Sequence, residues 1–364
     1  MNNGNLMVGG AAKVYALVGD VPDAAMSAYG RTTVDEEREL LLAADVGGTH
    51  ARLGLVAFSR RSATFDVQAY QVYPCREHAT LDAIVREFCD GLAIKPRRFA
   101  LACAGYLHQG RVINSHLHWP IEPAALERTL GLDEVRVLND FVALAHAVPH
   151  LAGDAATPLH TPAAQGAATG PVVVVGPGTG LGVAVRLPGP SPRVLPTEAG
   201  HIQLAARTAR ERQVLSVLAP ANEHTPYDTA LSGPGLLRVY RALCQIEGVA
   251  PAWYAPADVV ASAVANSDRL ASETMQLFCG WLGSFTGDLA MMYGATGGIH
   301  LAGGFLSQMT DLLRASTFVE RFLDKGVVRP FLETVPVQVV DHAQLGVIGA
   351  AHWLIERTAP DEPA

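Results

Sequence analysis

Two short glycine-rich turns, far apart in the chain, constrain its fold most strongly. The first, DVGGT at residues 45–49, lies between two apolar segments, and so does the second, GPGTG at residues 176–180. Each pattern predicts a β-hairpin whose tip exposes backbone N–H groups, because glycine leaves no side chain in the way. Converging N–H groups form a concavity that suits phosphate oxygens. One such hairpin is common, but two that each carry a threonine beside the glycines predict a duplicated core that holds a polyphosphate from both sides, as in a phosphotransferase.

The composition predicts a soluble globular protein and excludes several kinds of partner. The 364 residues suffice for two domains, with 49% hydrophobic and 17% charged residues. A net charge of −8 argues against nucleic acid and against an anionic membrane surface as partners. The five cysteines are scattered without a CxxC pair, and no apolar run approaches the roughly 20 residues that span a bilayer. We therefore expect reduced cysteines and a cytoplasmic location.

The order of predicted strands and helices favours an α/β protein of two domains. Three strands open the first domain, and alternating helices and strands follow. A segment at 152–170, rich in Ala, Pro, Gly and Thr, is the clearest boundary. We expect a loosely ordered N-terminal extension at 1–38, a small α/β domain formed by 39–150 together with 341–358, and a large α/β domain at 151–340. A cleft should separate the two domains.

Local signals mark several helices. Thr80 is a predicted N-cap, because apolar residues follow it at helical spacing over 81–92. Gly131 should end a helix at 122–130, and the segment 270–293 is long enough for a central packing helix.

Asn139 and Asp140 lie between a predicted buried strand and a predicted helix. Both residue types are favoured helix N-caps, which is one interpretation of the pair. The other is functional, because ligands of α/β sheets bind beyond the carboxyl ends of the strands, where Asp140 lies. A carboxylate there could accept the proton of an attacking hydroxyl group during phosphoryl transfer.

The segment TEAGH at residues 197–201 places a carboxylate, Glu198, and an imidazole, His201, around a glycine. It precedes a predicted strand at 202–204. An ordinary turn is one interpretation. Small polar groups that fix a polyhydroxylated substrate are the other.

Further glycines allow two interpretations as well. In LSGPG at 231–235, serine and proline predict a helix N-terminus, and the extra glycine favours the close approach of a nucleotide. The pairs Gly297–Gly298 and Gly303–Gly304 bracket a predicted strand. They either permit close packing or form a floor for an adenosine and its phosphates at the next helix N-terminus.

Six motifs in this order resemble the bacterial glucokinase family of the actin/hexokinase/Hsp70 superfamily: DVGGTHARLGL, VLNDFVALAHAV, GPGTGLGVA, EAGH, LSGPGL and GGIHLAGG. The resemblance runs from about residue 40 to residue 356. It implies a two-domain actin-like ATPase (ribonuclease H-like) fold with a duplicated βββαβα core and an interdomain cleft. It also implies a cytoplasmic transferase of glycolysis that uses ATP and Mg²⁺ to phosphorylate the 6-hydroxyl group of glucose.

The resemblance also implies a role for each matching residue. Asp140 would be the catalytic base. The sugar ligands would be Asn139, Asp140, Glu198, His201 and Asp228. The nucleotide would contact Asp45, Gly47, Gly48 and Thr49 of the first turn, Gly178, Thr179 and Gly180 of the second, and Gly303 and Gly304. Asp45 would also hold Mg²⁺ through water.

Three residues depart from the family pattern. His50 and His116 stand where the family has Asn, and Asp228 stands where it has a sugar-binding Glu. The shorter carboxylate is drawn back by about 1.5 Å, one C–C bond, which is enough to break a direct hydrogen bond to the sugar. The alternatives are therefore a kinase for a different hexose and a catalytically weak sugar-sensing regulator, although the intact Asp140 argues against the regulator.

The resemblance gives two further expectations. Members of the family are often dimeric, so we expect a homodimer. A related family of sugar kinases and repressors carries a cysteine-rich zinc motif after its Gly-His pair, whereas residues 202–218 contain no cysteine. We therefore expect no structural zinc of that kind.

Overall fold

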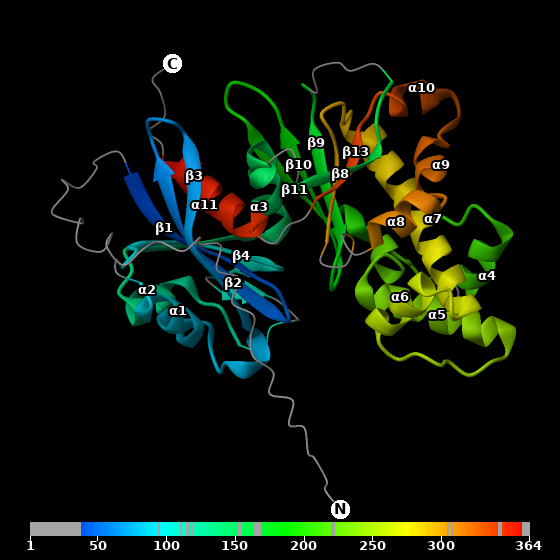
Figure 1. Ribbon diagram of the computed structural model, residues 1–364, viewed down its shortest axis with the longest axis horizontal. Helices are drawn as coiled ribbons and strands as arrows, with labels where there is room; N and C mark the ends of the chain where they lie inside the picture. Colours follow the sequence, from blue (N-terminus) through cyan, green and yellow to red (C-terminus); the bar gives the residue numbers. More distant parts are fainter. Residues whose placement is uncertain are drawn as a thin grey trace, which may run out of the picture.

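The structure is a computed structural model. It describes residues 38–92, 95–109, 111–113, 117, 119–151, 155–163, 169–219, 223–303, 306, 309–340 and 344–358. Two mixed β-sheets form its framework, and two helices lie between them (Figure 1). The predicted extension lies outside the described residues except for Arg38, which begins the first strand.

The first sheet has the strand order β3-β2-β1-β4-β7. Its strands are β1 (Arg38–Val46), β2 (His50–Ser59), β3 (Thr64–Pro74), β4 (Arg98–Cys103) and β7 (Glu134–Asn139). Strands β1, β2 and β3 pair antiparallel with one another, whereas β4 and β7 continue the sheet in parallel with β1. Apolar side chains join one face to α1 (Leu81–Asp90) and α2 (Pro123–Leu130), and the other to α3 (Asp140–Ala147) and α11 (Leu345–Thr358).

The second sheet has the order β11-β10-β9-β12-β13-β8. Its strands are β8 (Ala156–His160), β9 (Val172–Pro177), β10 (Leu181–Leu187), β11 (Arg193–Thr197), β12 (Gly298–Ala302) and β13 (Val337–Val340). As in the first sheet, three antiparallel strands are continued by parallel ones, and β8 adds an antiparallel edge. A separate two-stranded sheet consists of β5 (Tyr106–His108) and β6 (Arg111–Ile113).

The remaining helices cover the second sheet on its outer side (Figure 1). They are α4 (Ala209–Leu218), α5 (Gly233–Glu247), α6 (Pro256–Val264), α7 (Arg269–Tyr293), α8 (Thr310–Ala315), α9 (Phe318–Leu323) and α10 (Arg329–Leu332). Short 3₁₀ turns are η2 (Cys75–Glu77), η3 (Val148–His150), η4 (Ala199–His201), η5 (Tyr227–Thr229) and η7 (Gly326–Val328). Helix α7 is the central packing helix, because Phe278, Trp281 and Phe285 are buried in the largest apolar core.

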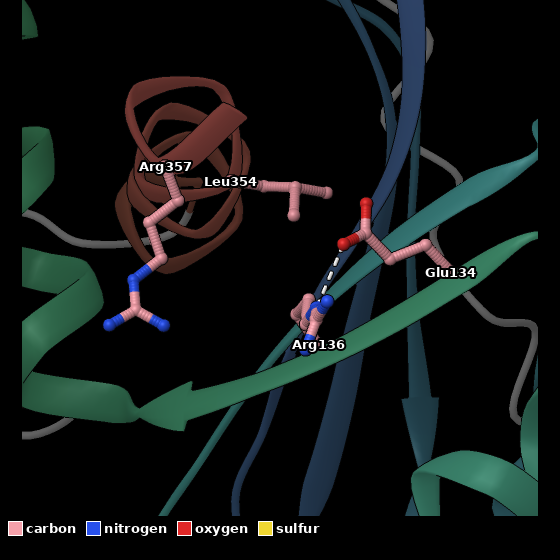
Figure 2. A pocket seen from close by; sticks show the side chains of 4 residues that line it. All are labelled: Glu134, Arg136, Leu354 and Arg357. Atoms are coloured by element: carbon pink, nitrogen blue, oxygen red, sulfur yellow. Dashed lines mark hydrogen bonds and ion pairs between the residues drawn. The ribbon is translucent and has the colours of Figure 1, made fainter. Parts of the chain in front are cut away.

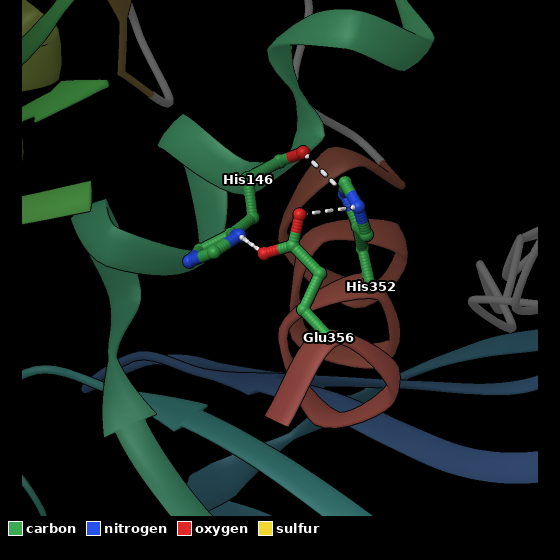
Figure 3. Close-up of side chains that lie close together, drawn as sticks. All are labelled: His146, His352 and Glu356. Carbon is green, nitrogen blue, oxygen red and sulfur yellow. Dashed lines mark hydrogen bonds and ion pairs between the residues drawn. The ribbon is translucent and has the colours of Figure 1, made fainter. Parts of the chain in front are cut away.

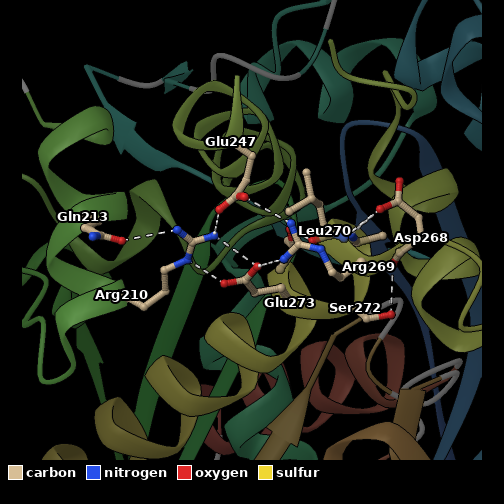
Figure 4. A network of polar contacts seen from close by, with 10 residues as sticks. Arg210, Gln213, Glu247, Asp268, Arg269, Leu270, Ser272 and Glu273 are labelled. Atoms are coloured by element: carbon tan, nitrogen blue, oxygen red, sulfur yellow. Dashed lines mark hydrogen bonds and ion pairs between the residues drawn. The ribbon is translucent and has the colours of Figure 1, made fainter. Parts of the chain in front are cut away.

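A polar network on the surface ties three of these helices together (Figure 4). Arg210 of α4 donates to Glu273 of α7 at 2.6 Å and to Glu247 of α5 at 2.7 Å. Arg269 reaches the same two carboxylates at 3.3 and 3.2 Å. Networked ion pairs of this kind fix relative positions, although each exposed pair contributes little stability on its own.

Helices α3 and α11 lie side by side although about two hundred residues separate them in the sequence (Figure 1). A Cβ atom added to Gly349 of α11 would lie only 1.8 Å from the carbonyl oxygen of Ala143 in α3. A larger residue would therefore push the helices apart. Helix α3 also packs on the second sheet through Ala145 and Ala147, so it links the two sheets.

One prediction about the local structure of the chain was wrong. Residues 202–204, which the structure describes, form no strand: Gln203 makes only an isolated bridge to Pro226. Pro226 has no N–H group, which limits the ladder there. The segment 152–170, which marks the predicted boundary, also holds strand β8 of the second sheet. Pro158 is tolerated in this strand because the strand lies at a sheet edge.

The cysteines agree with the expectation of reduced thiols. All five cysteines lie in described segments and are free thiols. Among the described residues, none of the helices combines the length and apolar character that crossing a bilayer requires.

Candidate functional site

The carboxyl ends of three parallel strands meet at one edge of the first sheet. Register pairs Val46 of β1 with Cys103 of β4, and Cys103 with Asn139 of β7. Asp45 and Asp140 flank this row. The Asp45 side chain faces α11, because a Cβ atom added to Gly346 would lie 2.8 Å from it.

Asp140 is the first residue of α3 and is only partly exposed. Its Oδ1 accepts the N–H of Phe141 at 3.0 Å. Burial and the negative charge of Asp45 raise the pKa of Asp140 to about 7. A carboxyl group with such a pKa can take up and release a proton near neutral pH, which is what a general base requires.

Asn139 caps α3, so that interpretation of the residue is confirmed. Its Oδ1 accepts the N–H groups of Phe141 at 2.9 Å and Val142 at 3.3 Å. The cap orients the side chain and leaves the amide Nδ2 as the group that could donate to a ligand.

The first hairpin consists of β1, the turn at 47–49 and β2. The N–H of Gly47 donates to the carbonyl of His50 at 3.0 Å and closes the turn around Gly48. The residue that follows β3, Cys75, stabilises the tip, because its N–H donates to the carbonyl of Thr49 at 2.9 Å. The tip is thus a fixed loop whose Thr49 side chain is exposed.

Charged and polar side chains surround this tip. Arg52 lies opposite Asp45 in the register, with Nη1 3.6 Å from the Asp45 Oδ2. Nδ1 of His50 lies 3.2 Å from the Thr49 hydroxyl oxygen. Burial together with Arg52 and Arg76 lowers the pKa of His50, so the ring is neutral near neutral pH and can serve as an uncharged polar group, as the expected Asn would.

The second hairpin consists of β9, the turn at 178–180 and β10. The N–H of Gly178 donates to the carbonyl of Gly180 at 2.7 Å, and Thr179 is exposed at the tip. The N–H of Gly233, the first residue of α5, donates to the carbonyl of Gly178 at 2.8 Å. The N-terminus of α5, capped by Ser232, therefore lies at the tip of this hairpin. Helix N-termini favour anions such as phosphate.

Phe141 connects the two halves of the site. Gly176 and Gly182 pair across the second hairpin, and a Cβ atom on Gly182 would lie 2.0 Å from ring atoms of Phe141. The two glycines thus leave a slot for the ring that follows Asp140. This contact holds the start of α3 against the second hairpin, and sequence reasoning missed it.

Three of the predicted sugar ligands, Asp228, Glu198 and His201, come from segments that pack on Leu181, where β10 begins. Oδ1 of Asp228 accepts the N–H of Leu181 at 2.7 Å. A Cβ atom on Gly200 would lie 2.2 Å from the Leu181 carbonyl oxygen, so the turn of Glu198 and His201 packs on the same residue. Glu198 and His201 are both exposed there.

The end of β12 lies beside the second hairpin. A Cβ atom on Gly303 would lie 2.6 Å from the carbonyl oxygen of Pro177, the last residue of β9. Close packing explains the pair Gly297–Gly298 before β12, because a Cβ atom on Gly297 would lie 2.2 Å from the carbonyl oxygen of Gly170. Gly304 and His116 lie outside the described residues.

The pocket in Figure 2 lies away from these residues. Glu134, Arg136, Leu354 and Arg357 line it. Glu134 begins β7, whereas Asn139 ends that strand, so the pocket lies at the opposite end of the sheet from Asp140.

Known proteins are similar to this chain in sequence and in fold. The family model for glucokinase matches residues 42–357. A relative named "Glucokinase-like protein", from Xylella fastidiosa (strain Temecula1 / ATCC 700964), is 43% identical over 324 residues, which cover 87% of this chain and 95% of the relative. A "Glucokinase" from Saccharophagus degradans is 37% identical over 315 residues, covering 86% and 97%.

Among solved structures, a glucokinase from an Antarctic psychrotroph aligns with a TM-score of 0.75 at 33% identity. The alignment covers 87% of this chain and 99% of that one. The chain has the α/β, actin-like fold of the sugar kinases in this family. It belongs to the glucokinase family.

Proposed function

We propose that this protein transfers the γ-phosphoryl group of ATP to the 6-hydroxyl group of glucose, with Asp140 as the general base. One observation carries the proposal most directly. The carboxyl group of Asp140, whose pKa is raised to about 7, lies at the start of a helix that Phe141 holds against the second hairpin. Membership of the glucokinase family supports the same reaction.

Asp140 acts on the sugar hydroxyl group. Its ionised carboxylate accepts the hydroxyl proton as the oxygen attacks the phosphorus, and positioning supplies most of the remaining rate. Asn139 donates to the sugar through Nδ2, and Glu198 and His201 bind further hydroxyl groups. These roles follow from the matched motifs and from the exposure of Glu198 and His201 beside the second hairpin.

The two hairpin tips hold the phosphates of ATP from opposite sides. Gly47, Gly48 and Thr49 form one side, and Gly178, Thr179 and Gly180 form the other. The matched motif assigns Gly303 and Gly304 to the adenosine side of the nucleotide. The N-terminus of α5 at the second tip adds a favourable dipole for the phosphates.

The acidic groups at this edge fit a magnesium ion. Asp45 and Asp140 are close enough for the charge of one to raise the pKa of the other, and carboxylate oxygens are suitable Mg²⁺ ligands. Asp45 would hold the ion through water. Bound Mg²⁺ would neutralise charge on the phosphate oxygens.

The two sheets are the two copies of the duplicated core in this proposal. Both begin with three antiparallel strands and continue with parallel ones in the same order. Residues 39–150 with 341–358 form the small domain, and 151–340 form the large domain. The packing of α11 on the first sheet supports this assignment. In this proposal the substrates bind in a cleft between the two domains.

A different hexose is the second candidate substrate, and Asp228 is the reason. Its Oδ1 is engaged by the N–H of Leu181 and lies next to Gly180, so it is directed at the second hairpin. Other family members have a sugar-binding Glu in place of Asp228. A hexose that is bound without this contact is therefore a second candidate.

A panel of hexoses tests both candidates. ADP release is measured with glucose, mannose, fructose and galactose, and the glucose product is identified with glucose 6-phosphate dehydrogenase. We expect glucose to give the highest kcat/KM and to yield glucose 6-phosphate. A higher kcat/KM for another hexose would favour the second candidate, whereas sugar binding without any ADP release would contradict both.

A further inference from the structure

A cluster of metal-ligand side chains lies at the junction of α3 and α11, outside the proposed active site. Figure 3 shows His146 of α3 with His352 and Glu356 of α11. Oε2 of Glu356 lies 2.9 Å from Nδ1 of His146, and Oε1 lies 3.0 Å from Nε2 of His352. His146 is near the end of α3, whereas Asp140 begins that helix, so the cluster is not needed for the proposed reaction.

The cluster is built on rigid elements. His352 and Glu356 are one helical turn apart on the same face of α11. The close contact of Gly349 with Ala143 fixes α11 against α3 in the same region. The ligand atoms of the three residues all lie within 4.8 Å of one another, a spacing that a single ion can bridge after small side-chain shifts.

Hydrogen bonding sets the tautomer of His352. Its Nδ1 lies 2.8 Å from the carbonyl oxygen of His146 and 3.1 Å from Nε2 of His150. The carbonyl can only accept, so a hydrogen on Nδ1 satisfies it, and Nε2 of His150 can accept from the same hydrogen. In the neutral ring, Nε2 therefore has a lone pair, and this lone pair faces a carboxylate oxygen of Glu356 3.0 Å away. Two acceptors at that distance need a cation between them, either a proton or a metal ion.

We propose that His146, His352 and Glu356 form a zinc-binding site that joins α3 to α11. Two imidazoles and one carboxylate, with water in the fourth position, are a known ligand set for Zn²⁺. Imidazole nitrogens select against Mg²⁺ and Ca²⁺, which prefer oxygen.

Two further features of the structure support this assignment. The carbonyl of His146 lies 2.8 Å from Nδ1 of His352 and orients the ring, as hydrogen-bond acceptors behind metal-bound histidines do. The Glu356 side chain is 32% exposed, which gives the ion and its water a path from solvent. The site differs from the cysteine-rich zinc motif considered above in both ligands and place.

Metal titration of the untagged, chelator-treated protein near neutral pH tests the proposal. Zn²⁺ affinity is measured by competition with a chromophoric chelator, and Co²⁺ is used as a spectroscopic probe of the ligand set. We expect one Zn²⁺ per chain, a visible Co²⁺ absorption band and a higher Tm with zinc. His352→Asn and Glu356→Gln should each weaken zinc binding by at least about tenfold and remove the Co²⁺ band.

His150→Asn is the matched control. The His150 ring belongs to the same region, but its Nε2 lies 3.1 Å from Nδ1 of His352, on the side away from Glu356. This variant should bind zinc as the wild type does. Glu356→Gln keeps the shape of the side chain, so it serves if His352→Asn fails to fold. A wild-type protein that binds no zinc, or variants that bind it with unchanged affinity, would show that a proton occupies the gap and would overturn the proposal.

Discussion

Replacing Asp140 by Asn should stabilise the protein in the absence of substrates. Burial and the negative charge of Asp45 both disfavour the ionised carboxylate of Asp140, and the neutral amide of Asn avoids this cost. The pKa of the carboxyl group is 3.8 in the reference state and about 7 in the folded chain. Because the unfolded chain ionises more readily than the folded one, this difference in pKa lowers the free energy of unfolding by about 4 kcal/mol at pH 8 and about 2 kcal/mol at pH 5. Because Asp140 is partly exposed to water, we expect about half of each value.

The direction of the pH dependence is part of the prediction. A carboxyl group whose pKa is raised on folding favours the folded state below its unfolded pKa, and this contribution is lost as the pH rises through about 7. The Asp140→Asn variant has no such loss, and the amide oxygen of its new side chain can still accept the N–H of Phe141.

Urea unfolding of both proteins, followed by circular dichroism at pH 8 and pH 5, measures the difference. The variant should be more stable at both values, by more at pH 8. Equal stability at pH 8, or a gain that grows toward low pH, would refute the reasoning.

Three further perturbations test other parts of the structure. Asp228→Glu should break the hydrogen bond from the N–H of Leu181 to the second hairpin's carboxylate partner and so raise the KM for ATP by about fivefold or more. Asp228→Asn keeps an acceptor oxygen and should leave this KM unchanged. A lower KM for glucose with an unchanged KM for ATP in the Glu variant would contradict this. Nη1 of the buried Arg321 lies 2.5 Å from Oε1 of Glu211. Glu211→Ala removes this carboxylate from the buried guanidinium and should lower the free energy of unfolding by about 3–5 kcal/mol. Glu320→Ala on the surface is its control, and equal urea midpoints for the two variants would count against the buried pair. Deletion of residues 1–37 should leave ADP release unchanged, since both sheets and both hairpins form from later residues; an inactive truncated protein would show that the extension is needed.

Much of the fold could be predicted because its signals are local. The side chain of Thr80 caps α1, and Gly131 ends α2 in the left-handed conformation, as expected. Thr208 and Glu211 form a capping box at α4. Each of these signals depends on residues within one turn of the chain, so tertiary contacts did not override it.

The contacts that assemble the site could not be predicted from local patterns. The two turns and the Asn139–Asp140 pair were found as motifs, but the slot for Phe141 arises only when Gly182 meets another part of the chain. Arg52 reaches Asp45 because the register of β1 and β2 puts them opposite each other. The role of Asp228 depended on its bond to Leu181, forty-seven residues away in the sequence.

Turnover of Asp140→Asn is the most direct test of the central claim that Asp140 is the general base. The isosteric amide keeps the shape of the site but cannot accept the hydroxyl proton, and general-base catalysis contributes about 10²–10⁴-fold. We therefore predict that kcat for glucose phosphorylation falls by at least about 10²-fold, while the Kd for glucose, measured by calorimetry, stays within a few-fold of the wild-type value. A variant that keeps more than half of the wild-type kcat would contradict the account.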